Sequence, residues 1–399
     1  MTVPLSEIAE VKLGRQRSPK NHTGDTMRPY LRAANVGWDG LRLDDVMQMN
    51  FTDAEMETFR LRPGDLVLNE ASGSPGEVGK PALWSGAIED CAFQNTLLRV
   101  RPSAKADPRY LLHYFRYQAV TGAFAQGSRG VGINHLGREA LASWPVPLPP
   151  LDDQQRIAVI LDQADSLRTK RRRSLALLEA LGGLVFEQMF GTEALPSRPL
   201  GELAETVSGI TKGRRLSGQV TRTVPYLAVV NVQAGELNLK SVKTIEATEA
   251  EIERYQLKAD DLVMTEGGDP DKLGRGALWR GELPLCLHQN HVFRVRVRDE
   301  AGVDPRYLAA YIRSRNARSY FLRSAKQTTG IASINMTQLR ALPVAVPPVD
   351  LQREFASRVE TINTQRTAAQ RSLASLDELF ASLQSQAFSG GFESREVRL

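Results

Sequence analysis

Catalytic motifs are scarce in this sequence. The stretch from Ser74 to Lys80 has the glycine-rich character of a phosphate-binding loop, a motif that needs two spaced glycines, a lysine and a following Ser or Thr. The first glycine is not at the required spacing, and Pro81 occupies the place of the residue that would hold magnesium. The Asn/Asp-Pro-Pro-aromatic motif of amino-methylating enzymes is also missing. We therefore do not expect the chain to transfer phosphoryl or methyl groups by itself.

Two further groups have residue types that bind metals. His288 and His291 have the spacing of a ligand pair, but Phe93 and Thr96 occupy the corresponding places in an earlier, similar stretch. We interpret the two histidines as residues at the end of a strand. Asp269 begins an Asp-Pro-Asp-Lys run that lacks the following Glu-x-Lys of a nuclease site. The sequence thus indicates a binding protein, and we expect no catalytic residue, no metal site and no cofactor in this chain.

Polar and basic residues instead gather in glycine-rich segments. Three of them occur in the first half of the chain and three in the second half, at 14–28, 71–80 and 125–134, and at 209–222, 267–275 and 325–335. Glycine with Arg, Lys, Asn, Gln and Ser is the composition that contacts phosphates and base edges of DNA, although such loops are often merely solvated. The candidate DNA-binding residues are Lys12, Arg15, Arg17, Lys20, Ser72, Ser74, Lys80, Gln94, Asn95, Arg129, Asn134, Lys212, Arg214, Arg215, Asp269, Lys272, Arg275, Gln289, Asn290, Lys326, Gln327, Thr328 and Asn335.

Composition gives weaker guidance. The net charge of +5 is mildly basic, and Arg is much commoner than Lys. Arg fits phosphates and the guanine edge with paired hydrogen bonds, but a GC-rich genome also produces an excess of Arg, and the sequence leaves both explanations open. Two cysteines cannot form a disulfide framework, which favours a reducing cytoplasm. No apolar run of about 18 residues predicts a membrane span, and the first residues lack the pattern of a secretion signal.

The segments recur because the chain contains two copies of one domain. With a displacement of about 196 residues, PLSEIAEVKLG (4–14) aligns with PLGELAETVSG (199–209), and FQNTLLRVR (93–101) aligns with HQNHVFRVR (288–296). DPRYL occurs at 107–111 and again at 304–308. Cys91 and Cys286 also fall at matching positions. Equivalent residues of separate copies are not expected to face each other, which argues against a disulfide between them.

Each copy predicts the same short elements. Thr52 with Glu55, and Thr248 with Glu251, have the spacing of capping boxes that begin a helix. The Asp-Pro pair that opens each DPRYL predicts a second helix, because Asp caps helix N-termini and Pro fits the first helical position. In VFRVRVR (292–298) apolar and Arg residues alternate, the pattern of a half-buried strand. Strands mixed with short helices predict an α+β domain of about 150 residues.

A long helix follows each copy after a proline-rich break. In both helices the seam residues repeat at spacings of four and three, as in a coiled coil, although Arg168, Arg171 and Gly182 interrupt the first seam. The predicted seam residues are Ile157, Leu161, Ala164, Leu175, Leu178 and Val185 in the first helix, and Phe355, Val359, Ile362, Leu373, Leu376, Phe380 and Leu383 in the second. Two amphipathic helices that each pack on their own domain are the alternative.

The order of the elements predicts how such helices pair. The second copy begins where the first helix ends, so the symmetric arrangement is antiparallel with one domain at each end. About 30 helical residues span roughly 45 Å, which exceeds one DNA turn of about 34–36 Å. A pair of helices of this length would separate two recognition surfaces by a constant distance. The sequence therefore predicts recognition of two short DNA sequences with a spacer of constant length.

PLPPLDDQQRIAVILDQADSL (147–167) and AVPPVDLQREFASRVETIN (345–363), together with GDLVLNE (64–70), FQNTLLRVR and DPRYL, resemble the specificity subunit of type I restriction–modification systems. The resemblance extends from about residue 4 to residue 390 and depends on the order and duplication of these motifs. It implies a fold of class α+β, with two tandem α/β target-recognition domains separated by a pair of long antiparallel coiled-coil helices. The implied boundaries are residues 1–150 and 200–348 for the domains, 151–190 and 349–390 for the helices, and 191–199 for a linker.

The resemblance also implies a function and partners. It implies a non-catalytic, cytoplasmic prokaryotic subunit in which each domain reads half of a bipartite double-stranded DNA target. Two methyltransferase subunits and restriction or translocase subunits would be its partners, and S-adenosylmethionine, ATP and Mg would belong to those partners. The residues alone leave two alternatives: a protein-binding scaffold with no DNA sequence preference, and a nuclease or methyltransferase in its own right, which the missing motifs disfavour.

Overall fold

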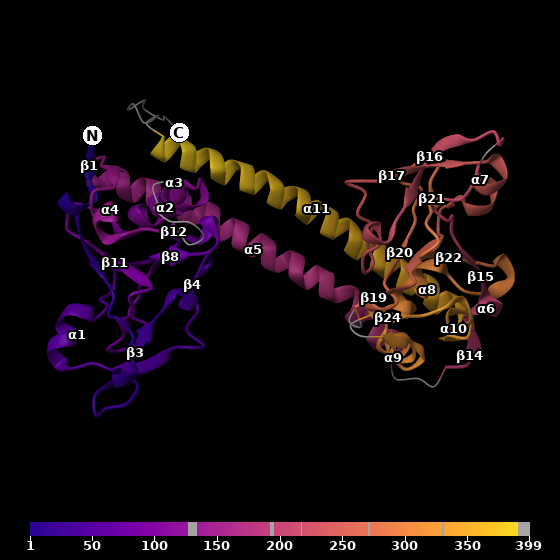
Figure 1. Cartoon of the computed structure of the whole chain (residues 1–399), viewed down its shortest axis with the longest axis horizontal. Coiled ribbons are helices and arrows are strands. Elements are labelled where there is room, and N and C mark those ends of the chain that lie inside the picture. Colours follow the sequence, from indigo (N-terminus) through magenta and orange to yellow (C-terminus); the bar gives the residue numbers. More distant parts are fainter. Residues whose placement is uncertain (127–133, 192–194, 217, 270–271, 329–330, 390–399) are drawn as a thin grey trace. The chain divides into compact units, whose positions relative to one another are not determined.

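A computed structural model of the chain (Figure 1) describes residues 1–126, 134–191, 195–216, 218–269, 272–328 and 331–389. The chain divides into two compact units: Met1–Arg172 with Arg371–Leu399, and Arg173–Gln370. Each unit therefore contains one copy of the duplicated domain together with one half of each long helix. Within the described part, none of the helices combines the length and the apolarity needed to cross a bilayer.

The first copy consists of short strands and helices and ends in the first long helix. Its elements are β1 (Thr2–Pro4), β2 (Ala9–Leu13), β3 (Met27–Leu31), β4 (Val36–Gly37), β5 (Gly40–Leu41), β6 (Met47–Asn50), α1 (Asp53–Phe59), β7 (Leu66–Asn69), β8 (Ala71–Ser72), β9 (Pro81–Leu83), β10 (Ala92–Phe93), β11 (Leu97–Pro102), α2 (Pro108–Val120), α3 (Ala123–Gln126), β12 (Asn134–His135), α4 (Arg138–Ala142), β13 (Pro145–Pro147) and α5 (Leu151–Phe190).

The second copy repeats this order with small changes. Its elements are β14 (Ser197–Pro199), α6 (Leu200–Leu203), β15 (Ala204–Ser208), β16 (Arg222–Leu227), β17 (Lys243–Ala247), α7 (Glu249–Tyr255), β18 (Leu262–Thr265), β19 (Gly267–Gly268), β20 (Gly276–Leu278), β21 (Leu287–His288), β22 (Val292–Val297), α8 (Pro305–Ile312), α9 (Arg315–Ser324), β23 (Lys326–Thr328), β24 (Ile331–Ser333), α10 (Met336–Arg340), β25 (Pro343–Ala345) and α11 (Val349–Phe388). Strand β14 lies inside the predicted linker and pairs with β25 as β1 pairs with β13.

The same sheets form in both copies. A four-stranded antiparallel sheet has the order β2-β11-β7-β9 in the first copy and β15-β22-β18-β20 in the second. A three-stranded mixed sheet, β10-β3-β6 or β17-β16-β21, stands beside it. The registers match: Leu13 pairs with Leu98 in the first copy, and Ser208 pairs with Phe293 in the second. These registers define which residues of the two copies correspond.

The predicted helix starts are confirmed. Thr52 and Thr248 accept hydrogen bonds from the backbone N–H of Glu55 and Glu251, and each glutamate bonds back to the backbone N–H of its threonine. Asp107 and its counterpart Asp304 cap α2 and α8, which both have proline in the first turn. The opening of DPRYL is therefore the same helix start in both copies.

The prediction for strand β22 is wrong on one point. The alternation of apolar residues with arginine predicts a solvated arginine face, but Arg294 is as buried as Phe293 beside it. The arginine face is covered by the end of α7, and the Arg294 guanidinium donates to the carbonyl of Arg254 at 2.9 Å and pairs with Glu205 at 3.3 Å. Arg99 forms the equivalent contacts in the first copy, with Thr58 and Glu10.

Apolar residues of both long helices complete the core of each unit. In the first unit the start of α5 packs in one cluster with Phe380 and Phe388 of α11, and the Phe388 ring lies 5.5 Å from Tyr110 and 5.4 Å from Tyr114. In the second unit Phe186 and Phe190 near the end of α5 share the core with Phe355 at the start of α11. The start of each helix thus packs with the end of the other, which confirms antiparallel pairing.

The predicted seam residues are all buried or half-buried. Arg168, which interrupts the first seam, is accommodated inside the first unit because its guanidinium pairs with Asp377 at 2.6 Å and stacks over Phe380 at 4.2 Å. Each helix has 40 residues, which is longer than the 30 expected and corresponds to roughly 60 Å.

A buried glutamine connects each long helix to its domain. Gln352 in α11 accepts a hydrogen bond from the backbone N–H of Asp304 at 2.8 Å and donates to the carbonyls of Gly302 and Pro347 at 3.0 and 2.8 Å. Gln154 in α5 makes the equivalent three bonds in the first unit. These bonds fix the rotation of each long helix about its own axis relative to the N-terminus of an earlier helix, α8 for α11 and α2 for α5.

The position of Phe388 yields a first testable prediction. We expect Phe388→Ala to lower the free energy of unfolding of the first unit by about 3–5 kcal/mol, because the variant lacks a buried ring that contacts two tyrosines and contains a cavity in its place. Leu379→Ala, which removes a half-exposed side chain from the same helix, is the control. Denaturant unfolding measures both changes, and equal small effects would contradict the packing of α11 on the first domain.

Candidate nucleic-acid interface

A Gln-Asn turn forms the centre of the candidate interface in each domain. Gln94 and Asn95 lie between β10 and β11, and Gln289 and Asn290 lie between β21 and β22. The segment after β2 runs beside the first turn, where the Asn95 N–H donates to the carbonyl of Arg15 at 3.0 Å. The N–H of Asn290 makes the same 3.0 Å bond in the second domain. The structure therefore brings the first residues of the glycine-rich segments, Gly14 with Arg15 and Gly209 with Ile210, against these turns.

The segment after β2 or β15 passes so close to the Gln-Asn turn that only glycine fits at one position of each copy. A Cβ atom at Gly14 would lie 2.2 Å from the carbonyl oxygen of Gln94, and one at Gly209 would lie 1.9 Å from the carbonyl oxygen of His288. Both distances are far below van der Waals contact. Any larger residue would push the turn away from the strand beside it, so glycine is required where the two segments cross.

A glutamate joins the turn to the remaining loops in each domain. The backbone N–H of Glu70 donates to the carbonyl of Thr96 at 2.9 Å, and its own carbonyl accepts from Leu136 at 2.7 Å. Glu266 connects the second turn to Ile334 in the same way, at 3.1 and 2.9 Å. Strand β8 also pairs with β12, and β19 pairs with β24. In each domain the glutamate therefore joins the Gln-Asn turn to the segment that begins the second loop group and to the segment that closes the third, while the first loop group contacts the turn itself.

The carboxylates of these glutamates pair with histidines from different segments. Glu70 faces His135 of β12 at 3.2 Å, whereas Glu266 faces His291 of the Gln-Asn turn at 2.6 Å. Both histidines are more than half exposed, at 52% and 58% of the side chain. Sequence reasoning did not single out Glu70, Glu266 or His135. The available signal was the glutamate that follows the strand at the same place in both copies.

Asn134 and Asn335 occupy different positions in the two domains. The sequence aligns the Ile-Asn pair at 133–134 with the pair at 334–335, which would make Asn134 and Asn335 equivalent. Asn134 instead pairs with Ser72 in the β8–β12 ladder, where its counterpart is Ala332. Asn335 caps α10 and accepts a hydrogen bond from the N–H of Gln338 at 2.9 Å. A length difference between the loops shifts the two asparagines to different positions.

Several predicted DNA-binding residues bond to neighbouring protein groups. Arg15 pairs with Glu55 at 2.6 Å, and Arg214 pairs with Glu251 at 2.8 Å. Arg214 lies four residues after Ile210, the counterpart of Arg15, so each domain forms this ion pair from a different position. The hydrogen bond from Arg214 lowers the pKa of Glu251 to about 2, although burial opposes the shift. These arginines hold their loops against α1 and α7.

The second loop group forms similar contacts. The Lys80 ammonium is buried between Glu77 and the ring of Trp38. Lys272 pairs with exposed Asp269 and lowers the pKa of its carboxyl. The Arg275 guanidinium donates to Gln233 at 3.2 Å.

Other candidates face solvent. Lys12 is half-buried in β2, and the four Gln and Asn residues of the turns are partly exposed. The exposed candidates are Arg17, Lys20, Ser74, Lys212 and Arg215. Arg129 and the side chains of Lys326, Gln327 and Thr328 lie outside the described residues. For every candidate, contact with DNA stays a prediction.

His288 occupies an apolar interior. Its ring is fully buried and Nδ1 donates to the carbonyl of Val292 at 2.6 Å, whereas His291 is exposed. Burial lowers its pKa to about 4. Among the residues that the structure describes, no three His, Cys, Asp or Glu side chains gather as metal ligands do. Cys91 and Cys286 are free and buried, and burial raises the pKa of each thiol to about 12.

The buried imidazole predicts a pH-dependent stability. An unfolded chain protonates His288 below its ordinary pKa of 6.5 and the folded chain only below about 4. Unfolding therefore takes up a proton between these values, and the free energy of unfolding falls by about 2 kcal/mol from pH 7 to pH 5. The corresponding residue, Phe93, does not titrate. In urea unfolding His288→Phe should lose less stability over this range than the natural chain, and equal losses would contradict the assignment.

The crossing at Gly14 predicts a steric effect. Gly14→Ala should displace the Gln-Asn turn and lower the free energy of unfolding by about 1–3 kcal/mol, because the new methyl group has no space beside the Gln94 carbonyl. Gly73→Ala is the matched control, since a Cβ atom there meets no atom within 4 Å. Faster amide hydrogen exchange of β10 and β11 in the first variant but not in the second is the expected result. Indistinguishable variants would argue against the crossing.

Comparison with known proteins identifies the family. Residues 1–179 match the type I restriction modification DNA specificity domain. The chain is similar to the StySPI specificity subunit of Salmonella potsdam (24% identity over 98% of this chain and 88% of the relative) and to the EcoKI specificity subunit of Escherichia coli K12 (26% identity over 97% and 88%). Both are described as type I restriction enzyme specificity subunits.

Solved structures share the fold. A chain from a study of complex assembly and conformational transition of the type I restriction–modification system aligns with a TM-score of 0.60 at 16% identity over 98% of both chains. The S subunit of a type I system from M. genitalium aligns with a TM-score of 0.57 at 12% identity over 97% of this chain and 96% of that one. The family match over residues 1–179 and the relatives of nearly full length show that this chain belongs to the DNA specificity subunits of type I restriction–modification systems, which are non-catalytic components of those enzymes.

Proposed function

We propose that this specificity subunit reads a bipartite DNA sequence, with one half-site for each domain. The observation that carries the proposal is that one glutamate, Glu70 or Glu266, joins the Gln-Asn turn of its domain to two further loop segments, while the loop after β2 or β15 contacts the same turn. The strands beneath the loops keep one register in both domains, whereas the loop residues differ. A shared scaffold with different loops is the arrangement expected of two readers with different targets. The boundaries of the domains, helices and linker given above belong to the same proposal.

The long helices are the proposed spacer. Each unit takes buried apolar residues for its core from both helices, so a change of helix register would disturb both cores at once. As the spacer in this proposal, the helix pair would keep a constant number of base pairs between the half-sites. Phosphate contacts from exposed Arg17, Lys20, Lys212 and Arg215 would fix the register of each domain, and the Gln-Asn turns would read base edges.

The proposed partners are two methyltransferase subunits and restriction or translocase subunits. An exposed apolar stripe on α5 supports protein docking, because Leu177, Leu181 and Leu184 lie one helical turn apart and are 73%, 38% and 63% exposed. S-adenosylmethionine, ATP and Mg would bind to those partners and supply the methyl-transfer and translocation chemistry. Since chromosomal and incoming DNA are the proposed ligands, we place the complex in the prokaryotic cytoplasm.

Mapping of methylated adenines tests the proposal. We expect coexpression of the chain with its methyltransferase subunit to modify a split sequence with one spacer length. Gln94→Ala should reduce the discrimination between bases in one half-site, and Gln289→Ala should reduce it in the other. The reason is that removal of a bidentate hydrogen-bonding side chain reduces discrimination by about 1–3 kcal/mol. The two variants are matched controls for each other. A loss of discrimination in the same half-site in both variants would contradict the proposal. Methylation without any sequence preference would favour the alternative of a protein-binding scaffold.

A further inference from the structure

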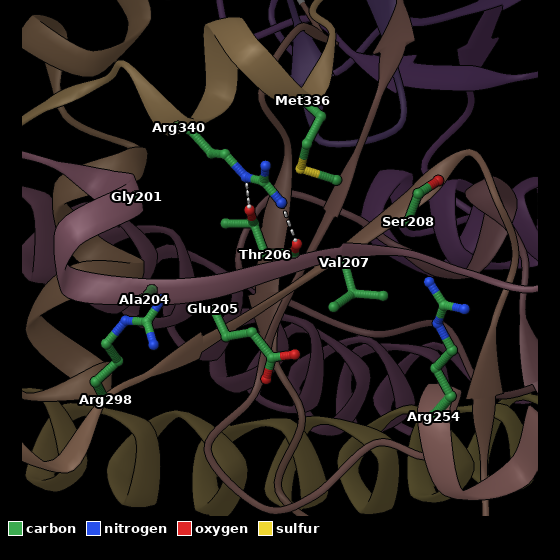
Figure 2. Close-up of a pocket in the computed structure, with 10 residues that line it drawn as sticks. All are labelled: Gly201, Ala204, Glu205, Thr206, Val207, Ser208, Arg254, Arg298, Met336 and Arg340. Atoms are coloured by element: carbon green, nitrogen blue, oxygen red, sulfur yellow. Dashed lines mark hydrogen bonds between the residues drawn. The ribbon is translucent and has the colours of Figure 1, made fainter. Parts of the chain in front are cut away.

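A polar groove follows the edge strand β15 of the second domain. It has a volume of about 570 Å³ and is lined by residues of α6, β15, the end of α7, the start of the loop after β22, and α10 (Figure 2). Strand β15 is the first strand of its sheet, so its outer edge has no neighbouring strand in that sheet. The Thr206 carbonyl points outward from this edge and accepts a hydrogen bond from the Arg340 guanidinium at 3.1 Å.

Three arginines give the groove an excess of positive charge. Figure 2 shows Arg254, Arg298 and Arg340 around β15. In the part of the chain that the structure describes, none of the three forms an ion pair with a carboxylate. Glu205 is the acidic residue of the lining, and it already pairs with the buried Arg294 at 3.3 Å. Guanidinium groups without carboxylate partners are suited to a phosphate, which accepts two parallel hydrogen bonds from each.

The groove borders the candidate DNA-binding loops. At one end the Ser208 hydroxyl donates to the carbonyl of Asn290, in the Gln-Asn turn, at 2.5 Å. Met336 of the lining directly follows Asn335 and strand β24. Arg254 lies in the last turn of helix α7, which the Arg214–Glu251 pair holds to the loop after β15. A duplex seated on the loops could therefore extend one strand of its backbone along the groove.

The first domain lacks these arginines at the equivalent positions. The strand registers and shared backbone contacts place Thr58, Ser103 and Ala142 where the second domain has Arg254, Arg298 and Arg340. An arginine does occur at the counterpart of Met336, but this residue, Arg138, pairs with Glu139 at 2.6 Å. The positive groove is thus a property of the second copy that the duplication does not explain.

We propose that the β15 groove binds a backbone phosphate of DNA flanking the second half-site, with Arg254 and Arg298 as the contacts and Arg340 in support. This inference rests on the proposed function. It makes the two domains unequal, because the second domain contributes an additional phosphate contact outside its loops. Such a contact adds affinity and salt dependence for any base sequence.

The test uses the complete complex with methyltransferase subunits and a duplex that contains the mapped target. Arg254→Gln with Arg298→Gln should weaken binding about tenfold near 100 mM salt and reduce the slope of log affinity against log salt by about one for each phosphate that the variant no longer neutralises. Arg315→Gln is the matched control, because Arg315 is an exposed arginine of the same domain that the described contacts leave without an ion pair. We expect the control to bind as the natural chain does. Because Arg254 and Arg298 are exposed, the free energy of unfolding should stay unchanged.

Uncharged methylphosphonates localise the contact. Single phosphates beside the second half-site are replaced one at a time. At one of these positions the replacement should lower the DNA affinity of the natural complex, and the same replacement should not lower the affinity of the Arg254→Gln/Arg298→Gln complex any further. Equal binding by this variant and the control, or a sensitive position beside the first half-site, would overturn the inference. So would a variant that binds DNA normally but assembles poorly with the methyltransferase, since the groove would then hold an acidic segment of that partner. If the natural complex shows no target preference and no salt dependence, the proposed function itself fails.

Discussion

The structure depends on cores that no single segment of the chain can complete. The core of the first unit contains Phe380 and Phe388, which are more than 200 residues away from the α2 rings that they contact, His113 for Phe380 and Tyr110 for Phe388. The second unit takes Phe186 and Phe190 from the helix that leaves the first domain. Because buried aromatic rings each contribute several kcal/mol, neither domain reaches its full stability until both helices are in place. The coiled-coil pattern and the domain cores are therefore two parts of one packing arrangement.

Charged residues have two distinct roles in this chain. Arg101 and its counterpart Arg296 form paired hydrogen bonds with the buried carboxylates of Asp65 and Asp261, and Arg99 and Arg294 are buried beside them. These arginines hold the strands and helices of the scaffold together through their contacts with protein groups. Arg17, Arg215, Arg254 and Arg298 are exposed, and the last two flank a groove. The excess of arginine thus has a structural component, which composition cannot separate from a DNA-binding one.

Duplication has preserved the frame more strictly than the surface. Glycine remains at the crossing of the Gln-Asn turn, and glutamine remains at the first turn of each long helix, because each satisfies a steric or hydrogen-bonding requirement that one residue type meets best. On the surface the same structural position is filled differently: the histidine beside the central glutamate comes from β12 in one domain and from the turn in the other. Loops that accept such changes while the frame stays constant can acquire different DNA targets.

The sequence by itself determined the duplication, the capped helix starts, the long helices and their seam, because these depend on local spacing and on alignment of the chain with itself. It did not reveal that Arg294 is buried, that Asn134 and Asn335 are not equivalent, or that Glu70 and Glu266 join three loops. These features depend on which segments meet across strand registers and loop lengths. The β15 groove is also a tertiary feature, since Arg254, Arg298 and Arg340 are far apart in sequence and line one groove only when α7, the end of β22 and α10 pack around one strand edge.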